Sequence, residues 1–191
     1  MKEMEDRILT QGEVLPGHIL KVGNFLNQQI DSAFLSRIGE EIASLFAESG
    51  VTKVMTIESS GIAIAASVGM AMNVPIIFAK KHKSSNVDGK VLSTTIHSYT
   101  HGNDYTAVVG ADYLLPGERV LLVDDFLANG NALEGLIRMV EQVGATVVGA
   151  ACAIEKGFQH GGDKLREKGY RIESLAIVDA MDDDGTVTFR R

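Results

Sequence analysis

The segment 120–132 constrains the fold of this chain more than any other feature of its sequence. Four apolar residues, Val120 to Val123, lead directly into two adjacent acids, Asp124 and Asp125, and a loop of small residues follows. The apolar residues after the loop recur at the spacing of one helix face: Leu133, Leu136, Ile137, Val140 and Val143. A buried strand that passes through a short loop into a helix is the repeating unit of an α/β fold.

The loop after the two acids has the features of a phosphate-binding turn. Asn131 is expected to cap the following helix, and Glu134, three residues later, would complete a capping box. Free backbone N–H groups and the positive end of a helix dipole would then face an anion. The plain alternative is an ordinary turn in which an Asp at the strand end is only a turn former. That alternative explains the apolar run and one acid, but not two acids followed by a small-residue loop.

Competing nucleotide-binding patterns and several classes of protein are excluded. The chain contains neither the G-x-x-x-x-G-K-[ST] pattern nor the G-x-G-x-x-G pattern. A length of 191 residues predicts one domain, and the net charge of −7 argues against a nucleic-acid-binding surface. Cys152 is the only cysteine and lies in an apolar run, so we expect a buried core residue. No signal peptide or membrane-spanning segment is evident, which predicts a soluble, cytoplasmic protein.

Strands and helices are expected to alternate along the chain. Helices are predicted at 3–10, from Asp31 to Gly50, at 62–72, after Asn131 and at 162–168. Strands are predicted at 53–57, 74–79, 120–123, 147–154, 174–178 and 186–189, with a β-hairpin at 91–99 and 105–109. This alternation predicts a parallel sheet, in which ligands bind at the carboxyl ends of the strands. The turns 58–61, 80–83 and 125–132 are therefore expected to lie together.

The segment from Asp124 to Ala132 resembles the signature of the type I phosphoribosyltransferases, which bind 5-phosphoribosyl-1-pyrophosphate. That family usually has hydroxyl-bearing or additional glycine residues in this loop, and here alanine and asparagine stand instead. The resemblance implies an α/β fold with a central parallel sheet flanked by helices, a hood segment and a flexible β-hairpin loop. We expect one phosphoribosyltransferase domain at 1–191, with 1–31 and 155–191 contributing the base-binding hood.

The resemblance also implies a role for each turn. Asp124 and Asp125 would be the catalytic acids, facing the ribose hydroxyls and the positive charge that develops on the ring. The donor 5′-phosphate would lie in the loop formed by Ala128, Asn129, Gly130, Asn131 and Ala132. Pyrophosphate would be bound by Glu58, Ser59, Ser60, Gly61, Lys81 and Lys83. Mg²⁺ would be held through the substrate and not by a dedicated set of protein ligands. Without the resemblance, 58–61 could equally be a helix-capping turn, and the lysines a solvated face.

Further segments closely resemble the bacterial xanthine phosphoribosyltransferases: 20–31, 57–63, 81–84 and 124–130. In that family the positions of Leu20, Asn27 and Lys156 contact xanthine, and Phe158 could pack on the face of the base. From spacing alone, a surface lysine, a core phenylalanine and an unliganded asparagine would be the simpler interpretation. The resemblance implies a homodimer that makes xanthosine 5′-monophosphate and pyrophosphate from xanthine and the donor. The alternatives are another purine (guanine, hypoxanthine or adenine) as substrate, or a non-catalytic regulator that senses the donor on the same fold.

Overall fold

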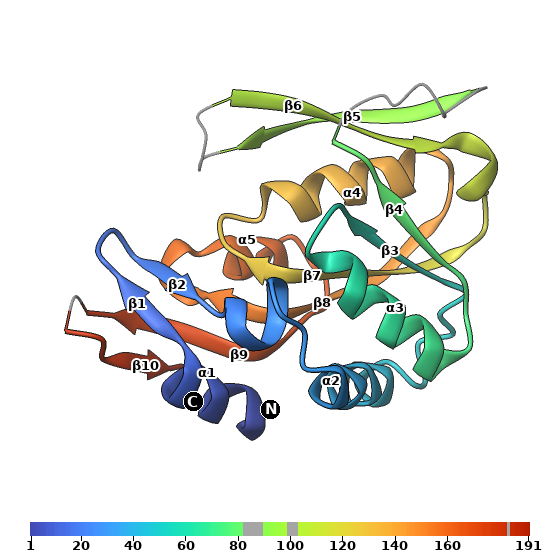
Figure 1. Ribbon diagram of the computed structural model, residues 1–191. Helices are drawn as coiled ribbons and strands as arrows, with labels where there is room; N and C mark the ends of the chain where they lie inside the picture. Colours follow the sequence, from blue (N-terminus) through green and yellow to red (C-terminus); the bar gives the residue numbers. More distant parts are fainter. Residues whose placement is uncertain (82–89, 99–102, 183) are drawn as a thin grey trace.

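The computed structural model describes residues 1–81, 90–98, 103–182 and 184–191 (Figure 1). Within these residues, six strands form the central sheet, and their bounds are β3 (Lys53–Ile57), β4 (Ile76–Ala79), β7 (Arg119–Leu127), β8 (Thr146–Lys156), β9 (Ile172–Met181) and β10 (Val187–Phe189). Their order across the sheet is β10-β9-β8-β7-β3-β4. All neighbours from β9 to β4 pair in parallel, and β10 pairs antiparallel with β9. The predicted central parallel sheet is confirmed.

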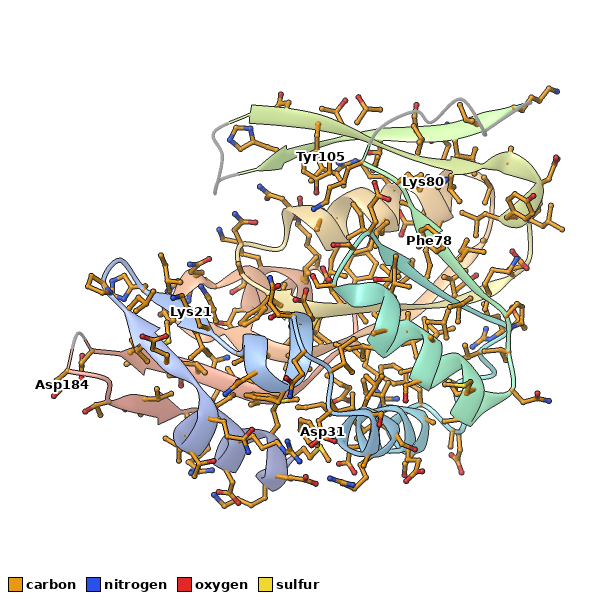
Figure 2. The ribbon with its side chains drawn as sticks, viewed as in Figure 1. Lys21, Asp31, Phe78, Lys80, Tyr105 and Asp184 are labelled. Carbon is orange, nitrogen blue, oxygen red and sulfur yellow. The ribbon has the colours of Figure 1, made fainter. Side chains whose placement is uncertain are left out.

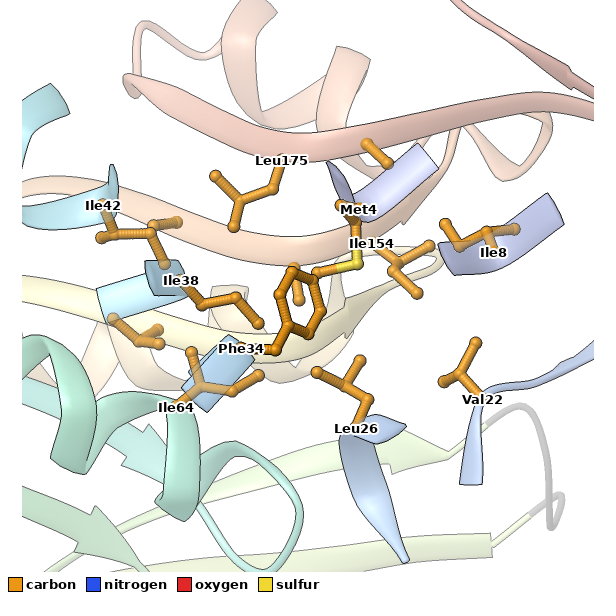
Figure 3. Packing of buried hydrophobic residues seen from close by; sticks show 14 of the residues in the cluster. Met4, Ile8, Val22, Leu26, Phe34, Ile38, Ile42, Ile64, Ile154 and Leu175 are labelled. Atoms are coloured by element: carbon orange, nitrogen blue, oxygen red, sulfur yellow. The ribbon is translucent and has the colours of Figure 1, made fainter. Parts of the chain in front are cut away.

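Helices cover both faces of this sheet. Their bounds are α1 (Lys2–Gln11), α2 (Ser32–Leu45), α3 (Gly61–Met72), α4 (Asn131–Gln142) and α5 (Gly161–Glu167). The first three lie on one face, and α4 and α5 lie on the other (Figure 1). Each face therefore has its own apolar core. In the core under α1, α2 and α3, side chains from all three helices and from the sheet converge around Phe34 (Figure 3).

Local sequence signals explain where α2 begins and where α3 ends. The Asp31 carboxylate accepts a hydrogen bond from the Phe34 N–H at 3.0 Å, so Asp31 caps α2 as predicted. Ile38 and Ile42, at helical spacing from Phe34, are fully buried. Asn73 takes the left-handed conformation with a φ of 55° and ends α3.

The predicted capping of α4 is wrong. The helix begins at Asn131, so Gly130 occupies the cap position, with a left-handed φ of 88°. The Asn129 side-chain oxygen accepts a hydrogen bond from the Asn131 N–H at 3.1 Å. Asn131 itself donates from Nδ2 to the His97 carbonyl at 2.9 Å, and Glu134 is therefore not its capping-box partner. A residue inside the first turn of a helix cannot serve as its cap, because the cap position lies outside the helical conformation.

Strand β7 is longer than the apolar run that predicts it. It continues through both acids to Leu127, because β8 extends alongside it and pairs Asp124 with Cys152 and Phe126 with Ile154. The two acids thus lie in a rigid strand of the sheet and not in the loop. Successive residues of a strand leave the backbone toward opposite faces, so the two acids have different neighbours, although their carboxyl groups stay close enough to interact.

The predicted hairpin is confirmed as β5 (Val91–Ser98) and β6 (Asn103–Gly110), which pair antiparallel. It lies over α4 (Figure 1). Ile96 is 2% exposed and packs where Gly135 of α4 has no side chain: a Cβ atom there would lie 2.5 Å from Ile96 Cγ1. Lys80 and Val108 exchange two backbone hydrogen bonds of 2.8 Å, which join the end of β4 to β6.

The segment expected to form the hood consists of small elements outside the sheet and part of the sheet itself. A short antiparallel pair, β1 (Glu13–Leu15) with β2 (Ile19–Lys21), leads into a π-helix at Gly23–Asn27. Phe25 and Leu26 of this π-helix are buried in the core beneath α1 and α2. From the carboxyl-terminal part, a 3₁₀ turn at Gly157–Gln159 follows β8, whereas β9 and β10 extend the central sheet.

Candidate active site

The strand order reverses between β3 and β7. In chain order the sheet first grows from β3 to β4, and the next strand of the sheet, β7, then joins the opposite side of β3. Such a reversal leaves a gap between the two outgoing connections, where α/β sheets bind their ligands. Both acids of β7 and the turn that begins at Glu58 lie at this edge.

Contacts between the turns confirm that two of the predicted segments come together. The Glu58 carboxylate accepts a hydrogen bond from the Lys81 N–H at 2.6 Å, and the Glu58 N–H donates to the Ala79 carbonyl at 3.0 Å. Gly61 begins α3, and a Cβ atom there would lie 3.0 Å from Asp124 Oδ1. The amino end of a 12-residue helix thus rests against Asp124. Helix amino termini carry a partial positive charge that favours anions such as pyrophosphate.

The other residues predicted to bind pyrophosphate are Ser59, Ser60, Lys81 and Lys83. Ser59 and Ser60 lie in the turn between β3 and α3, and the Glu58–Ser59 peptide bond is cis. The Lys81 ammonium lies 5.6 Å from the centre of the Tyr105 ring, which comes from β6. Figure 2 shows Tyr105 and Lys80 on the hairpin side of the molecule. Lys83 lies outside the described residues.

The two acids are both 8% exposed but have different surroundings. Asp124 Oδ1 accepts a hydrogen bond from the Asp125 N–H at 2.9 Å. Burial, and secondarily the neighbouring Asp125 carboxylate, raises the pKa of Asp124 above its ordinary value of 3.8. Asp125 Oδ2 accepts a hydrogen bond from Asn27 Nδ2 at 3.2 Å. Asp125 therefore contacts the π-helix, whereas Asp124 faces α3. Burial, and secondarily the negative charge of Asp124, raises the pKa of Tyr105.

The loop predicted to bind the 5′-phosphate is held by α5. The Gly161 N–H donates to the Ala128 carbonyl at 3.2 Å. A Cβ atom at Gly161 would lie 2.2 Å from that oxygen and 2.6 Å from the Gly130 nitrogen, so only glycine permits this approach. Ala132 lies in the first turn of α4, whose amino end points at the loop. The loop, including Asn129 and Asn131, therefore combines a close-packed backbone with a helix dipole.

The four residues predicted to contact the base come from two sides. Leu20, 7% exposed, belongs to β2, and Asn27 ends the π-helix. Opposite them, Lys156 ends β8 and donates from Nζ to the His18 carbonyl at 3.0 Å. The Phe158 ring lies 5.4 Å from the His18 ring. The connection between β1 and β2 and the turn after β8 are therefore in direct contact.

Sequence reasoning missed three residues near these groups. The centre of the Phe126 ring lies 5.8 Å from the Lys156 ammonium, and the position of Phe126 between the acids and the loop is the signal that could have identified it. His18 gives no distinguishing signal in the sequence. Thr56 is fully buried, and within the described residues its hydroxyl has no hydrogen-bond partner. That hydroxyl lies 2.3 Å from where a Gly61 Cβ would stand, next to the amino end of α3.

The oxygen donors at this edge suit a metal ion carried by a substrate. In the described parts of the chain, no group of three or more His, Cys, Asp or Glu side chains is arranged to hold a metal. Asp124 and Asp125 offer carboxylate oxygens, which Mg²⁺ prefers, but two residues are too few for a site without further ligands. Phosphate oxygens of a bound substrate would supply the rest.

None of the helices in the described ranges has the length and hydropathy that a membrane span requires.

The model of the phosphoribosyl transferase domain matches residues 27–181, which include both acids, the loop 128–132 and the turn after β3. The chain belongs to the phosphoribosyltransferase family. This member of the family is 50% identical to a xanthine phosphoribosyltransferase from Lachnoclostridium phytofermentans, over all of this chain and 98% of the relative. It is also 50% identical to a xanthine phosphoribosyltransferase from Bifidobacterium adolescentis, over the whole of both chains.

Solved structures of phosphoribosyltransferases share the fold. An adenine phosphoribosyltransferase from Giardia lamblia, complexed with 9-deazaadenine, superposes with a TM-score of 0.76 and 22% identity, covering 92% of this chain and 96% of that one. One from Trypanosoma brucei, in complex with AMP, pyrophosphate and ribose-5-phosphate, gives a TM-score of 0.78 at 16% identity, covering 95% and 82%. At these identities the likeness establishes the type I phosphoribosyltransferase fold alone.

Proposed function

We propose that this chain transfers the 5-phosphoribosyl group from 5-phosphoribosyl-1-pyrophosphate to xanthine, giving xanthosine 5′-monophosphate and pyrophosphate. The observation that carries the proposal is the hydrogen bond between Asn27 and Asp125. It puts the amide expected to read the base next to the acid expected to face the ribose. Half of all residues are identical to relatives named xanthine phosphoribosyltransferases, along the full chain, which supports the same choice of base.

The donor has three anionic or polar parts, and the site offers a separate element to each. The loop around Gly130 suits the 5′-phosphate, since the amino end of α4 points at it. The turn from Glu58 to Gly61, with the amino end of α3, suits the pyrophosphate. Asp125 and Asp124 lie between these two elements and suit the ribose. This order along the edge of the sheet matches the order of groups in the donor.

The acids would stabilise the charge that develops during transfer. As the bond to pyrophosphate loosens, the ribose ring becomes positively charged, and fixed carboxylates beside it lower the free energy of that state. The pyrophosphate leaves toward Lys81 and the amino end of α3. Asp124 or Asp125 would help to hold a substrate-borne Mg²⁺, which would supply positive charge to offset that of the leaving group. Holding base and donor in fixed positions supplies much of the remaining rate enhancement.

The base is read from two directions. Xanthine carries an oxygen at position 2 where guanine carries an amino group, so a hydrogen-bond donor must face that position. Asn27 has two amide hydrogens. One is donated to Asp125, and the other would be donated to the 2-oxygen of xanthine. Lys156 has three donors and gives one to the His18 carbonyl, so it can also bind the 6-oxygen. Burial lowers the pKa of Lys156. A buried donor left without a partner costs about 1–3 kcal/mol, which disfavours guanine.

A direct assay tests the proposal. The purified protein is incubated with xanthine, the donor and Mg²⁺, and xanthosine 5′-monophosphate and pyrophosphate are quantified separately. Equal amounts of the two products, and none when xanthine or the donor is omitted, are expected. Pyrophosphate released without nucleotide would indicate simple hydrolysis of the donor and would contradict the proposal.

The reaction belongs in the cytoplasm, because the donor and the product are charged phosphate esters that do not cross a membrane unaided.

The proposed enzyme is a homodimer that associates through α3 and β4. Met70 on α3 is 75% exposed and lines a hollow with Pro75 and Ile76. A second hollow, lined by Ile76 and by Phe78, which is 37% exposed, continues from it along β4, the edge strand of the sheet. Exposed apolar side chains along a strand edge favour burial against another chain. Light scattering should give twice the chain mass of 20.5 kDa for the parent, and Met70→Lys should shift the equilibrium toward the single chain.

A further inference from the structure

A network of ion pairs lies behind the turn that carries Lys156 and Phe158. Arg190, close to the carboxyl end of the chain, donates from Nε to Asp179 Oδ1 at 2.9 Å and from Nη1 to Asp163 Oδ1 at 2.6 Å. Asp179 belongs to β9 and Asp163 to α5. One guanidinium therefore joins a strand of the sheet to the helix that follows the turn.

The turn rests directly on this ion pair. Gly157 separates Lys156 from Phe158, and a Cβ atom at Gly157 would lie 2.3 Å from Asp179 Oδ1 and 2.9 Å from Arg190 Nη2. The backbone of the turn therefore has no freedom to approach the sheet further. The ion pair sets how far the turn projects from β9.

The residue before the turn is fixed by a second ion pair. Glu155 is fully buried, and its two carboxylate oxygens accept hydrogen bonds from Arg166 of α5 at 2.8 and 2.7 Å. This two-point geometry is the strongest form of carboxylate recognition by arginine. The Ser174 hydroxyl donates to Glu155 at 2.5 Å as well. Because Arg166 also donates to Asp163 at 3.4 Å, the two ion pairs are connected through α5.

Helix α5 also holds the loop expected to bind the 5′-phosphate, through the Gly161 N–H that donates to the Ala128 carbonyl. The same helix thus contacts the base-reading turn through the ion pairs and the 5′-phosphate loop through its first residue. The turn is expected to bind the base and the loop the donor phosphate, so a displacement of the turn relative to the loop would weaken binding of the base beside the donor.

We infer that Arg190 is a positioning residue that holds the base-reading turn Lys156–Phe158 at its working distance from the 5′-phosphate loop. The inference rests on the proposed function. Arg190 touches neither the expected base nor the donor, and acts through Gly157 and Asp163. Its side chain is 32% exposed, as is that of Asp163. Ion pairs with this exposure contribute little to overall stability, so the protein should fold without them.

Arg190→Gln tests the inference because it removes the charge and keeps much of the side-chain volume. We expect KM for xanthine to rise roughly tenfold, as for the loss of one well-placed hydrogen bond, with kcat within about twofold of the parent. Arg190→Lys keeps the charge but cannot bridge two carboxylates with a planar fork, so KM should lie between those of Arg190→Gln and the parent. Should Arg190→Gln fail to fold, Asp179→Asn weakens the same contact and replaces it in the test.

Arg171→Gln is the matched control. Arg171 also pairs with a carboxylate, that of Glu173 at 2.9 Å, but it lies before the amino end of β9, opposite the ligand loops. Parent-like KM values are expected for this variant. The inference is overturned if folded Arg190→Gln keeps the parent's KM for xanthine, or if Arg171→Gln raises it equally. A parent protein that forms no nucleotide from xanthine would instead contradict the proposed function itself.

Discussion

A single methyl group added at Gly161 is expected to weaken binding of the phosphoribosyl donor. In Gly161→Ala, the new Cβ atom would lie 2.2 Å from the Ala128 oxygen, 2.5 Å from the Asn129 carbonyl carbon and 2.6 Å from the Gly130 nitrogen. All three are backbone atoms of the loop proposed to bind the 5′-phosphate. No flexible side chain can move aside to relieve the contact, so the loop or the start of α5 must shift.

Forced insertion of one carbon into a close-packed site costs about 1–3 kcal/mol. If the loop is displaced, this cost is incurred on binding, because the loop must return to its original place to contact the phosphate. The dissociation constant of the donor should then rise roughly 5- to 160-fold. Titration calorimetry with the donor and Mg²⁺ measures this directly, and urea denaturation of the same variant measures any loss of stability.

Gly110→Ala is the matched control for this prediction. A Cβ atom at Gly110 would also meet a close neighbour, the Tyr113 ring at 2.9 Å, but that side chain is 65% exposed and can swing into solvent. Donor affinity should be unchanged in this variant. The reasoning fails if folded Gly161→Ala binds the donor as tightly as the parent does, because the loop would then not be the phosphate site.

Three further predictions concern the acids and the base-reading residues. Asp125→Asn should lower kcat roughly 100-fold or more while the fold is retained, because the amide can still accept from Asn27; parent-like kcat would exclude an electrostatic role. Asn27→Ala should erode the discrimination between xanthine and guanine, whereas Lys156→Ala should weaken the binding of both bases. Competition assays with the two bases measure this. The opposite result would mean that Lys156 reads position 2 and Asn27 the 6-oxygen. The raised pKa of Asp124 means that the folded protein binds an extra proton above pH 3.8, so the free energy of unfolding should fall as pH rises from there toward the raised pKa. Urea denaturation of Asp124→Asn should lack this fall, and an unchanged pH slope would contradict it.

The order of the elements could be predicted from the sequence because each depends on local patterns. Strand β3 is predicted at its observed bounds, and Asp31 is predicted correctly as a cap, since both signals lie within a few residues. The end of β7 could not be predicted in this way. Its apolar run stops at Val123, but the strand continues to Leu127 because β8 continues beside it. The length of a strand depends on its neighbour, which a local pattern does not contain.

The sequence names candidate residues for the site one by one, but the contacts that connect them could not be predicted. Parallel topology was enough to bring the turns of Glu58 and Lys81 together. The contact between Asn27 and Asp125 joins residues 98 positions apart and depends on how the π-helix packs. The support of the base-reading turn by Arg190 likewise arises only from the folding of the carboxyl-terminal strands onto α5. The roles of these residues toward base and donor stay predictions that the variants above test.

The choice of base is the central claim, and relative catalytic efficiency tests it most directly. The measurement is kcat/KM for xanthine, guanine, hypoxanthine and adenine, each with saturating donor and Mg²⁺, with the nucleotide product identified by mass. The account predicts the highest value for xanthine, with guanine lower by roughly tenfold or more, as expected when one buried donor loses its partner. A higher kcat/KM for guanine, hypoxanthine or adenine than for xanthine would contradict it.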